Sequence, residues 1–259
     1  MASVADEPAH DPIPMIQRRL VLASPLLMTA CASPHLVTPT PEPLREAQHP
    51  HRFAGPGLLE PVQAWLHLPR GYLASSHAWP LVFFLHGSGE RGSELDRVKV
   101  HGPPRHAAAG RDYPFVLVSP QLPAGRRWSA SDLHALLGVL RRDLRIDPTR
   151  VTATGLSLGG HGVWEWACAY PEDLAGIAPV CGYGSPDDVC RMKAVPVRAY
   201  HGDADTVVPL AEQQACIDAL RACGGTAEFT IYRDVGHDAW TPAYEDPALV
   251  PWLMARRRS

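Results

Sequence analysis

Several marks of other protein classes are missing from this 259-residue sequence. The apolar run from Leu20 to Ala30 is too short to cross a bilayer as a helix. No Cys-x-x-Cys pair occurs, which argues against a zinc ribbon or a thioredoxin-like redox site. The formal net charge is only -3, and neither an internal repeat nor a nucleic-acid-binding motif is found. We therefore expect no nucleic-acid partner and no metal site.

Proline, in contrast, is abundant. The chain has 27 prolines, about twice the average usage, and they are concentrated in residues 1–69. Because proline removes a backbone donor and fixes φ, this first quarter of the chain is a poor candidate for packed core. The overall apolar content of 46% is that of an ordinary globular protein, so we expect the core to lie further along the chain.

The N-terminal region resembles an export signal. Arg18 and Arg19 precede the apolar run, and the run ends in small residues before Cys31. Residues 27–31 resemble the lipobox of bacterial lipoproteins, in which the cysteine is lipidated, although Met28 departs from the usual leucine. Residues 17–22 also resemble, weakly, a twin-arginine motif. The alternative is a short buried helix with an incidental cysteine. We expect an exported protein, periplasmic or anchored to the membrane through Cys31.

These patterns divide the chain into three parts. Residues 1–31 are a doubtful start plus a signal peptide, and Met15 suits the beginning of such a signal better than Met1 because residues 1–14 are acidic and proline-rich. Residues 32–57 lack periodicity and indicate a proline-rich linker. Residues 58–259 are expected to form one catalytic domain.

The body of the chain alternates strand and helix patterns. Continuous apolar runs such as residues 80–85 are typical of strands buried on both faces of a sheet. Leucines at helical spacing follow Ser131 and Asp132, which suit a helix start. This alternation predicts an α/β protein with a mainly parallel sheet covered by helices on both faces and a minimal lid. The expected strands are 62–68, 80–85, 115–118, 151–154, 177–180, 197–200 and 228–232; the expected helices are 131–145, 158–170, 210–222 and 247–257.

The segment Gly155-Leu156-Ser157-Leu158-Gly159 matches the nucleophile elbow G-x-S-x-G, between an expected strand and an expected helix. Ser157 is therefore the candidate nucleophile. A serine hydroxyl needs a base, and in proteins with this elbow between a strand and a helix the chain order is serine, acid, histidine. Asp205 follows the strand 197–200, with Asp203 as a competitor better suited to a turn, and His237 is the only histidine after Asp205. A plain glycine-rich turn is the alternative for the elbow.

When a serine attacks a carbonyl group, the negative oxygen that forms is stabilised by nearby backbone N–H groups. One donor is expected from Leu158, directly after the nucleophile, and the other from the glycine-rich loop after residues 80–85. We favour the N–H of Ser88, with Gly89 as second choice. The loop lacks the Gly-Lys-Ser/Thr ending of a phosphate-binding P-loop. His86 and His201 each precede a glycine at a strand end, where a structural hydrogen bond is the simpler role.

Together these motifs resemble α/β-hydrolases, across about residues 60–256. The most similar groups are dienelactone hydrolases, phospholipase/carboxylesterases, feruloyl-esterase-like enzymes and a group of predicted peptidases. The resemblance implies that Gln121, Trp128 and Trp240, together with Gly89, line the substrate site; core packing is the alternative for the three larger residues. It implies no cofactor.

The sequence therefore predicts a serine hydrolase that cleaves carboxylic esters, of small molecules or attached to polysaccharides, through a Ser-His-Asp triad and an acyl-enzyme. One alternative is a serine peptidase of the prolyl-oligopeptidase type. Another is a catalytically inactive, anchored binding protein. Neither the oligomeric state nor the particular ester follows from the sequence.

Five cysteines follow Cys31, an odd number that leaves at least one of them free. Cys168 falls in an apolar helical pattern and is expected to be a small core residue. Proximity alone suggests the pairs Cys181–Cys190 and Cys216–Cys223, but the sequence does not fix the connectivity.

Overall fold

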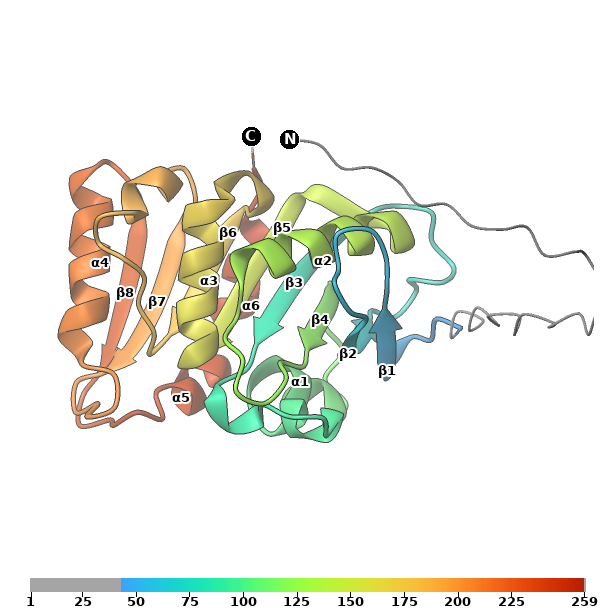
Figure 1. Cartoon of the computed structure of the whole chain (residues 1–259), viewed down its shortest axis with the longest axis horizontal. Helices are drawn as coiled ribbons and strands as arrows, with labels where there is room; N and C mark the ends of the chain where they lie inside the picture. The colour runs from blue at the N-terminus through green and yellow to red at the C-terminus, as the bar shows by residue number, and fades with distance from the viewer. Residues whose placement is uncertain (1–42, 259) are drawn as a thin grey trace, which may run out of the picture. The chain divides into compact units, whose positions relative to one another are not determined.

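The computed structural model describes residues 43–258, which contain an eight-stranded sheet with helices on both faces (Figure 1). The order across the sheet is β1-β2-β4-β3-β5-β6-β7-β8. β1 and β2 pair antiparallel, as do β2 and β4, and the other neighbours run parallel. The strands are β1 Ala47–Phe53, β2 Val62–Leu68, β3 Trp79–Leu85, β4 Val116–Pro120, β5 Ile146–Leu156, β6 Gly176–Val180, β7 Val197–Gly202 and β8 Ala227–Tyr232.

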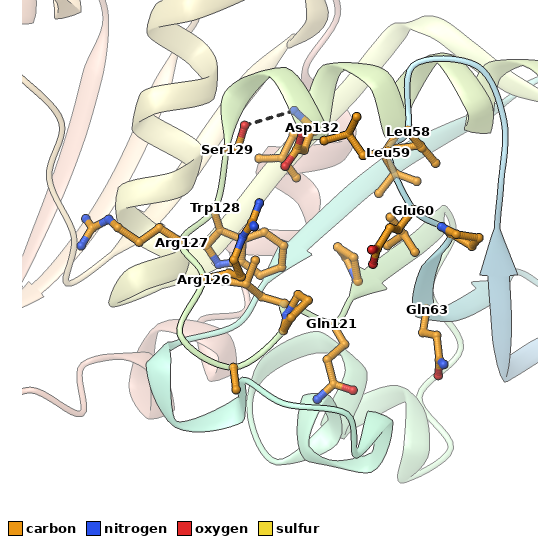
Figure 2. A pocket seen from close by; sticks show the side chains of 18 of the residues that line it. Leu58, Leu59, Glu60, Gln63, Gln121, Arg126, Arg127, Trp128, Ser129 and Asp132 are labelled. Carbon is orange, nitrogen blue, oxygen red and sulfur yellow. Dashed lines mark hydrogen bonds between the residues drawn. The ribbon is translucent and has the colours of Figure 1, made fainter.

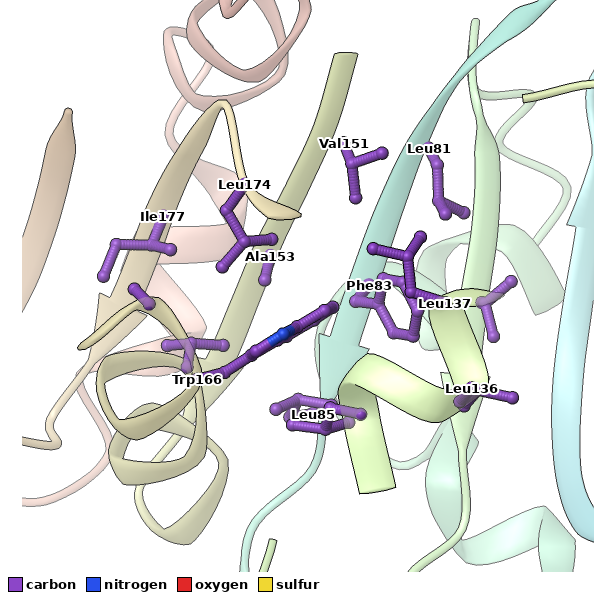
Figure 3. Packing of buried hydrophobic residues seen from close by; sticks show 14 of the residues in the cluster. Leu81, Phe83, Leu85, Leu136, Leu137, Val151, Ala153, Trp166, Leu174 and Ile177 are labelled. Atoms are coloured by element: carbon purple, nitrogen blue, oxygen red, sulfur yellow. The ribbon is translucent and has the colours of Figure 1, made fainter. Parts of the chain in front are cut away.

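The continuous apolar run of β3 serves two cores, because successive side chains of a strand point to opposite faces of the sheet. Leu81, Phe83 and Leu85 belong to one buried cluster, whereas Val82 and Phe84 belong to the other. In the first cluster Phe83 meets the Trp166 ring edge-on, with the ring centroids 4.9 Å apart (Figure 3). The central strand is therefore buried on both sides, as its sequence predicts.

Each cluster is closed by its own set of helices. Residues of α2 (Ala130–Asp143), α3 (Leu158–Ala169) and α4 (Leu210–Ala222) pack into the first cluster. Residues of α1 (Gly102–Ala108), α5 (Trp240–Glu245) and α6 (Leu249–Ala255) pack into the second. The expected α/β-hydrolase architecture, a mainly parallel sheet with helices on both faces, is confirmed.

Most expected elements are found within a few residues of their predicted bounds. The helices α1 and α5 were not expected from the sequence. Both helices carry proline in their first turn: Pro103 and Pro104 in α1, and Pro242 in α5. The pattern Gly-Pro-Pro suggests a loop, yet the first N–H groups of a helix have no intrahelical partner, so proline is tolerated there. The expected terminal helix over 247–257 is shorter, because α6 begins only at Leu249 and ends at Ala255.

The expected linker over residues 32–57 is wrong in its second half. β1 lies inside that range and pairs with β2 along its whole length. His49 and Phe53 are buried, and Pro50 is accommodated because β1 is an edge strand. The two histidines and the proline conceal the strand pattern, so the boundary expected at residue 58 lies too late.

Both cysteine pairs suggested by proximity are also wrong. The disulfide joins Cys190 to Cys223, 33 residues apart, with their Cα atoms 5.9 Å from each other. It links the short 3₁₀ helix Val189–Met192 to the end of α4. Cys168, Cys181 and Cys216 are free and buried, as expected for Cys168.

The export signal, the lipobox and Cys31 lie outside the described residues. Within residues 43–258, every helix is too short or too polar to span a lipid bilayer.

Candidate active site

Ser157 lies between β5 and α3 with an unusual backbone conformation. Its φ is 51° and its ψ is -115°, a region that residues other than glycine rarely adopt. The turn is held on both sides, since the Ser157 N–H donates to Val180 O at 2.9 Å and Ser157 O accepts from the His161 N–H at 3.0 Å. Strained conformations of this kind persist only where the surroundings enforce them, and they occur often at functional sites.

The glycines of the elbow are required by close backbone contacts. A Cβ on Gly155 would lie 2.5 Å from Gly159 O, and a Cβ on Gly159 would overlap Leu85 O. The first residues of α3 therefore pack directly against the end of β3, with no room for a side chain between them. This contact brings the loop that follows β3 next to Ser157.

His237 and Asp205 complete a hydrogen-bonded chain with Ser157. His237 Nε2 lies 2.9 Å from Ser157 Oγ, and His237 Nδ1 lies 2.8 Å from Asp205 Oδ2. The three residues come from loops after β5, β7 and β8, at the carboxyl edge of the sheet. The structure thus brings together all three residues that the sequence singles out.

The Asp205 carboxylate is held by the backbone as well. Its Oδ1 accepts the N–H groups of Val207 and Val208, each at 2.9 Å. Burial acts to raise the pKa of Asp205, but the hydrogen bonds from His237, Val208 and Val207 outweigh it and lower the pKa below its usual range. Asp203 is exposed and accepts the Asp234 N–H at 2.7 Å, which ties the two loops together.

Backbone donors for an oxyanion are available on two sides of Ser157. Leu158 is the first residue of α3, so its N–H has no partner inside the helix. Ser88 and Gly89 are exposed in the single 3₁₀ turn Ser88–Glu90 directly after β3. Both segments flank the contact between Gly159 and Leu85, so the expected pair of donors comes from adjacent chain segments.

His86 fixes the loop after β3 through hydrogen bonds of its buried ring. Its Nε2 accepts the Leu122 N–H at 3.0 Å, and its Nδ1 lies 2.7 Å from Gly87 O, so the proton belongs on Nδ1. Burial lowers the pKa of His86 to about 4, which keeps the ring neutral. The His86 ring thus fastens the loop after β3 to the loop after β4, which is the structural role expected from its position.

The residues expected to line the substrate site have different surroundings. Gln121 is buried and donates to Glu90 O at 3.0 Å and Glu94 O at 2.9 Å, so its amide braces residues 86–94 after β3, the oxyanion loop. Trp128 also braces it, because Trp128 Nε1 donates to His86 O at 3.1 Å. Trp240 is half-buried and meets the His237 ring edge-on at 5.3 Å. Of the four, Trp240 is thus the one with a direct contact to the Ser157–His237–Asp205 chain, whereas Gly89 is exposed in the turn after β3.

Gln121 and Trp128 also line a groove of about 580 Å³ at the same edge of the sheet (Figure 2). Its walls come from residues 58–63, from Gly92 and Ser93, and from the segment 120–136 that leads into α2. Ser157, Asp205 and His237 do not line it. The groove lies beside the oxyanion loop, with Trp128 as part of their common wall.

Cys181 is a close neighbour of the site that sequence reasoning did not place there. Ligand atoms of Cys181, Asp205 and His237 all lie within 4.8 Å of one another. Burial raises the pKa of the Cys181 thiol well above its usual range. An ion held by these three residues would compete with the hydrogen bond between His237 and Asp205. The Cys181 position directly after β6 is the only signal in the sequence that could have indicated it.

His161 is a second neighbour of the site that the sequence did not single out. It lies one turn after Ser157 on α3, and its Nδ1 is 2.8 Å from Tyr183 O. Burial lowers the pKa of His161, which favours the neutral ring. The spacing of four residues from the elbow serine predicts its nearness to the site, although its partner after β6 is not predictable from the sequence.

Comparisons with known proteins agree with this fold. Residues 119–246 match the family model described as phospholipase/carboxylesterase. A putative carboxymethylenebutenolidase of Methylorubrum extorquens is 30% identical over 138 residues, covering 47% of this chain and 46% of that protein. The putative esterase NocK of Nocardia uniformis is 30% identical over 163 residues, covering 56% of this chain and 45% of that protein. The match thus spans less than half the length of these curated relatives.

Solved structures extend the likeness over most of the described residues. A thermostable esterase superposes with a TM-score of 0.70 at 27% identity, covering 82% of this chain and 64% of that one. The dipeptidyl peptidase 4 of Porphyromonas gingivalis has a TM-score of 0.66 at 16% identity, covering 82% of this chain and 36% of that one, which shows a shared fold alone. The chain thus has the α/β-hydrolase fold, and it is similar in sequence to phospholipase/carboxylesterases and carboxymethylenebutenolidases and in fold to a ferulic acid esterase.

Proposed function

We propose that the protein is a serine hydrolase that cleaves carboxylic esters. The observation that carries the proposal is the hydrogen-bonded chain from Ser157 Oγ through His237 to Asp205, built on an elbow whose nucleophile has a positive φ. Relatives named as esterases and carboxymethylenebutenolidases support this class of reaction.

The proposed reaction uses these groups in two stages. Ser157 Oγ attacks the ester carbonyl while His237 Nε2 takes its proton, and Asp205 keeps the imidazole oriented and stabilises the imidazolium. The N–H groups of Leu158 and Ser88 stabilise the negative carbonyl oxygen, and each such donor contributes on the order of 10²–10³ in rate in related sites. His237 then protonates the leaving alcohol. In the second stage water attacks the acyl-enzyme while His237 takes its proton, and His237 then returns that proton to Ser157 Oγ as the acid leaves.

A fluorophosphonate probe tests the nucleophile. The wild-type protein is expected to be labelled at Ser157 and to hydrolyse p-nitrophenyl acetate, and Ser157→Ala is expected to lose both. Ser76→Ala is a matched control, because Ser76 is an exposed serine in the loop before β3, at the edge of the sheet opposite Ser157. If wild type and Ser157→Ala are labelled equally, or if wild type is not labelled, the serine hydrolase is refuted and the inactive binding protein remains.

A peptidase is the second candidate, since peptidases share the fold. Esters and matched aminoacyl p-nitroanilides distinguish the two. An esterase is expected to turn over the ester far faster, because amide hydrolysis also requires protonation of a poor leaving group. Comparable kcat/KM values on the two substrates would favour the peptidase.

We further propose that the groove beside the oxyanion loop receives the non-reacting part of a longer ester. Its walls mix apolar residues such as Leu59 with the charged groups Glu60, Arg126 and Asp132, which suits an elongated, partly polar ligand. Feruloylated or acetylated polysaccharide fragments and small lactones are the substrates to compare. Hydrolysis of lactones alone, with no gain from an attached sugar chain, would refute a role for the groove.

We propose, finally, that the protein is exported and anchored through a lipid on Cys31. The disulfide Cys190–Cys223 fits this view, because disulfides persist in oxidising compartments. Cys31→Ser is expected to move the protein from the membrane fraction to the soluble fraction. A Cys31→Ser protein that still fractionates with membranes would refute lipidation.

A further inference from the structure

His201 is fully buried beside Asp205, although the reaction described above does not use it. It is the fifth residue of β7, and its side chain contacts the loop that carries Asp205. His201 Nε2 lies 3.2 Å from Asp205 Oδ2 and 2.9 Å from Val208 O. On the other side of the ring, Nδ1 lies 2.5 Å from Gln213 Oε1 of α4. The ring is thus fixed between the helix and the acid.

The hydrogen of His201 can be assigned from these contacts. Both neighbours of Nε2 are oxygen acceptors, a carbonyl and a carboxylate, so Nε2 must carry a proton. Nδ1 faces the amide of Gln213, which can present either its oxygen or its nitrogen and therefore suits a ring nitrogen with or without hydrogen. Gln213 is also fully buried, and its Nε2 is 3.5 Å from Pro179 O.

The Asp205 carboxylate has three hydrogen bonds and one further contact. Oδ1 accepts from two backbone N–H groups and Oδ2 accepts from His237 Nδ1, while His201 Nε2, whose hydrogen bond goes to Val208 O, also lies 3.2 Å from Oδ2. The two histidines approach the same oxygen, so His201 limits how far Oδ2 can turn away from His237. It also shares the negative charge that faces His237.

We propose that His201 is a positioning residue of the active site: through its Nε2–H it fixes Asp205 Oδ2 toward His237 and shares the charge of that oxygen. The proposal rests on the proposed function, because it concerns the same serine hydrolase site. His201 does not touch the substrate. Its loss should therefore lower kcat and leave KM nearly unchanged.

The charge sharing gives a second expected effect, with a defined sign. Without His201, the whole charge of Asp205 Oδ2 acts on His237 and favours its protonated form, so a higher pH is needed to free the base. The other titratable groups near His237 are His161 of α3, Cys181 after β6, and its sequence neighbour Asp238. Beyond Trp240 lie His101 and Glu90, 3.7 Å from each other. None of these groups changes when His201 is replaced.

The test compares the pH dependence of kcat/KM in variants of the full chain. His201→Leu removes the donor and keeps an apolar side chain of similar reach, whereas His201→Gln can place an amide N–H near the position of Nε2. His67→Leu is the matched control, since His67 is a buried histidine of β2 that lies 3.4 Å from Asp112. We expect His201→Leu to lower kcat about 10- to 100-fold and to raise the acid limb by about 0.5 pH units or more. His201→Gln should stay near wild type, and His67→Leu should change neither quantity.

The outcomes separate the proposal from a merely structural role and from the function on which it rests. If His201→Leu does not fold, His201→Asn replaces it, because the shorter amide does not reach Asp205. An acid limb that stays at the wild-type pH in the variant without the donor overturns the proposal. So does a loss of kcat in His201→Gln as large as in that variant. A wild-type protein that the fluorophosphonate does not label would instead overturn the proposed function.

Discussion

The positive φ of Ser157 makes an unusual prediction about stability: glycine at this position should be more stable than alanine. Both Ser157→Ala and Ser157→Gly lack the hydroxyl, so the two variants differ only in the Cβ atom and in backbone freedom. At φ 51° and ψ -115°, a Cβ costs about 2 kcal/mol. Glycine loses about 1 kcal/mol more backbone entropy on folding. The difference leaves Ser157→Gly about 1 kcal/mol more stable than Ser157→Ala.

Gly138 provides the reference for this comparison. It is exposed in the middle of α2, and a Cβ built there would meet nothing within 4 Å. Ordinary helix propensity applies, so Gly138→Ala should stabilise the protein by about 1 kcal/mol. The order of alanine and glycine is thus expected to invert between positions 138 and 157.

Urea unfolding followed by circular dichroism measures both differences. A difference of 1 kcal/mol corresponds to about 2–4 °C in Tm for a domain of this size, so thermal unfolding is a second readout. The slope of the free energy of unfolding against urea should be the same in all variants. If Ser157→Gly is less stable than Ser157→Ala, the turn at Ser157 is not strained and the elbow geometry described above is wrong.

Three further predictions concern other parts of the domain. The pKa of His86 is about 4 in the fold and 6.5 in the unfolded chain, so the contribution of His86 to stability is complete above pH 6.5 and is lost as the pH falls toward 4. The free energy of unfolding, measured against pH, should fall by at most roughly 3 kcal/mol for this reason. An equal fall in His86→Gln would contradict this prediction. Cys190→Ser or Cys223→Ser opens a loop of 33 residues and should cost about 3–4 kcal/mol in urea unfolding without reductant, whereas unchanged stability would mean that the disulfide does not form. Leu59→Asp in the groove wall should raise KM for long esters about 10-fold while p-nitrophenyl acetate is unaffected, and equal effects from the exposed Leu73→Asp outside the groove would refute a role for the groove.

Local patterns predicted much of the fold and the site. The apolar runs of β3 and β6, the leucine spacing of α2 and the elbow around Ser157 are each written in a few consecutive residues. Asp205 and His237 could be found because each follows a strand at the carboxyl edge, where parallel strands bring their loops together.

The features that were missed depend on residues far apart in the chain. The partner of Cys190 is set by how α4 packs on the sheet, not by spacing along the sequence. The bracing roles of Gln121 and Trp128 arise because the loops after β3 and β4 meet. β1 is hidden because its burial alternates through histidine and proline rather than through aliphatic residues. The local sequence around Cys190, Gln121, Trp128 and β1 does not specify which distant residues will pack against them.

The proline in β1 has a consequence for how the molecules behave toward one another. An edge strand offers unpaired N–H and C=O groups to which a strand of a second molecule can add. Pro50 brings no N–H to the middle of β1, and so a strand added along this edge would lack one of its hydrogen bonds there. A residue that looks like a sign of poor folding in the sequence thus guards the edge of the sheet against self-association at high concentration.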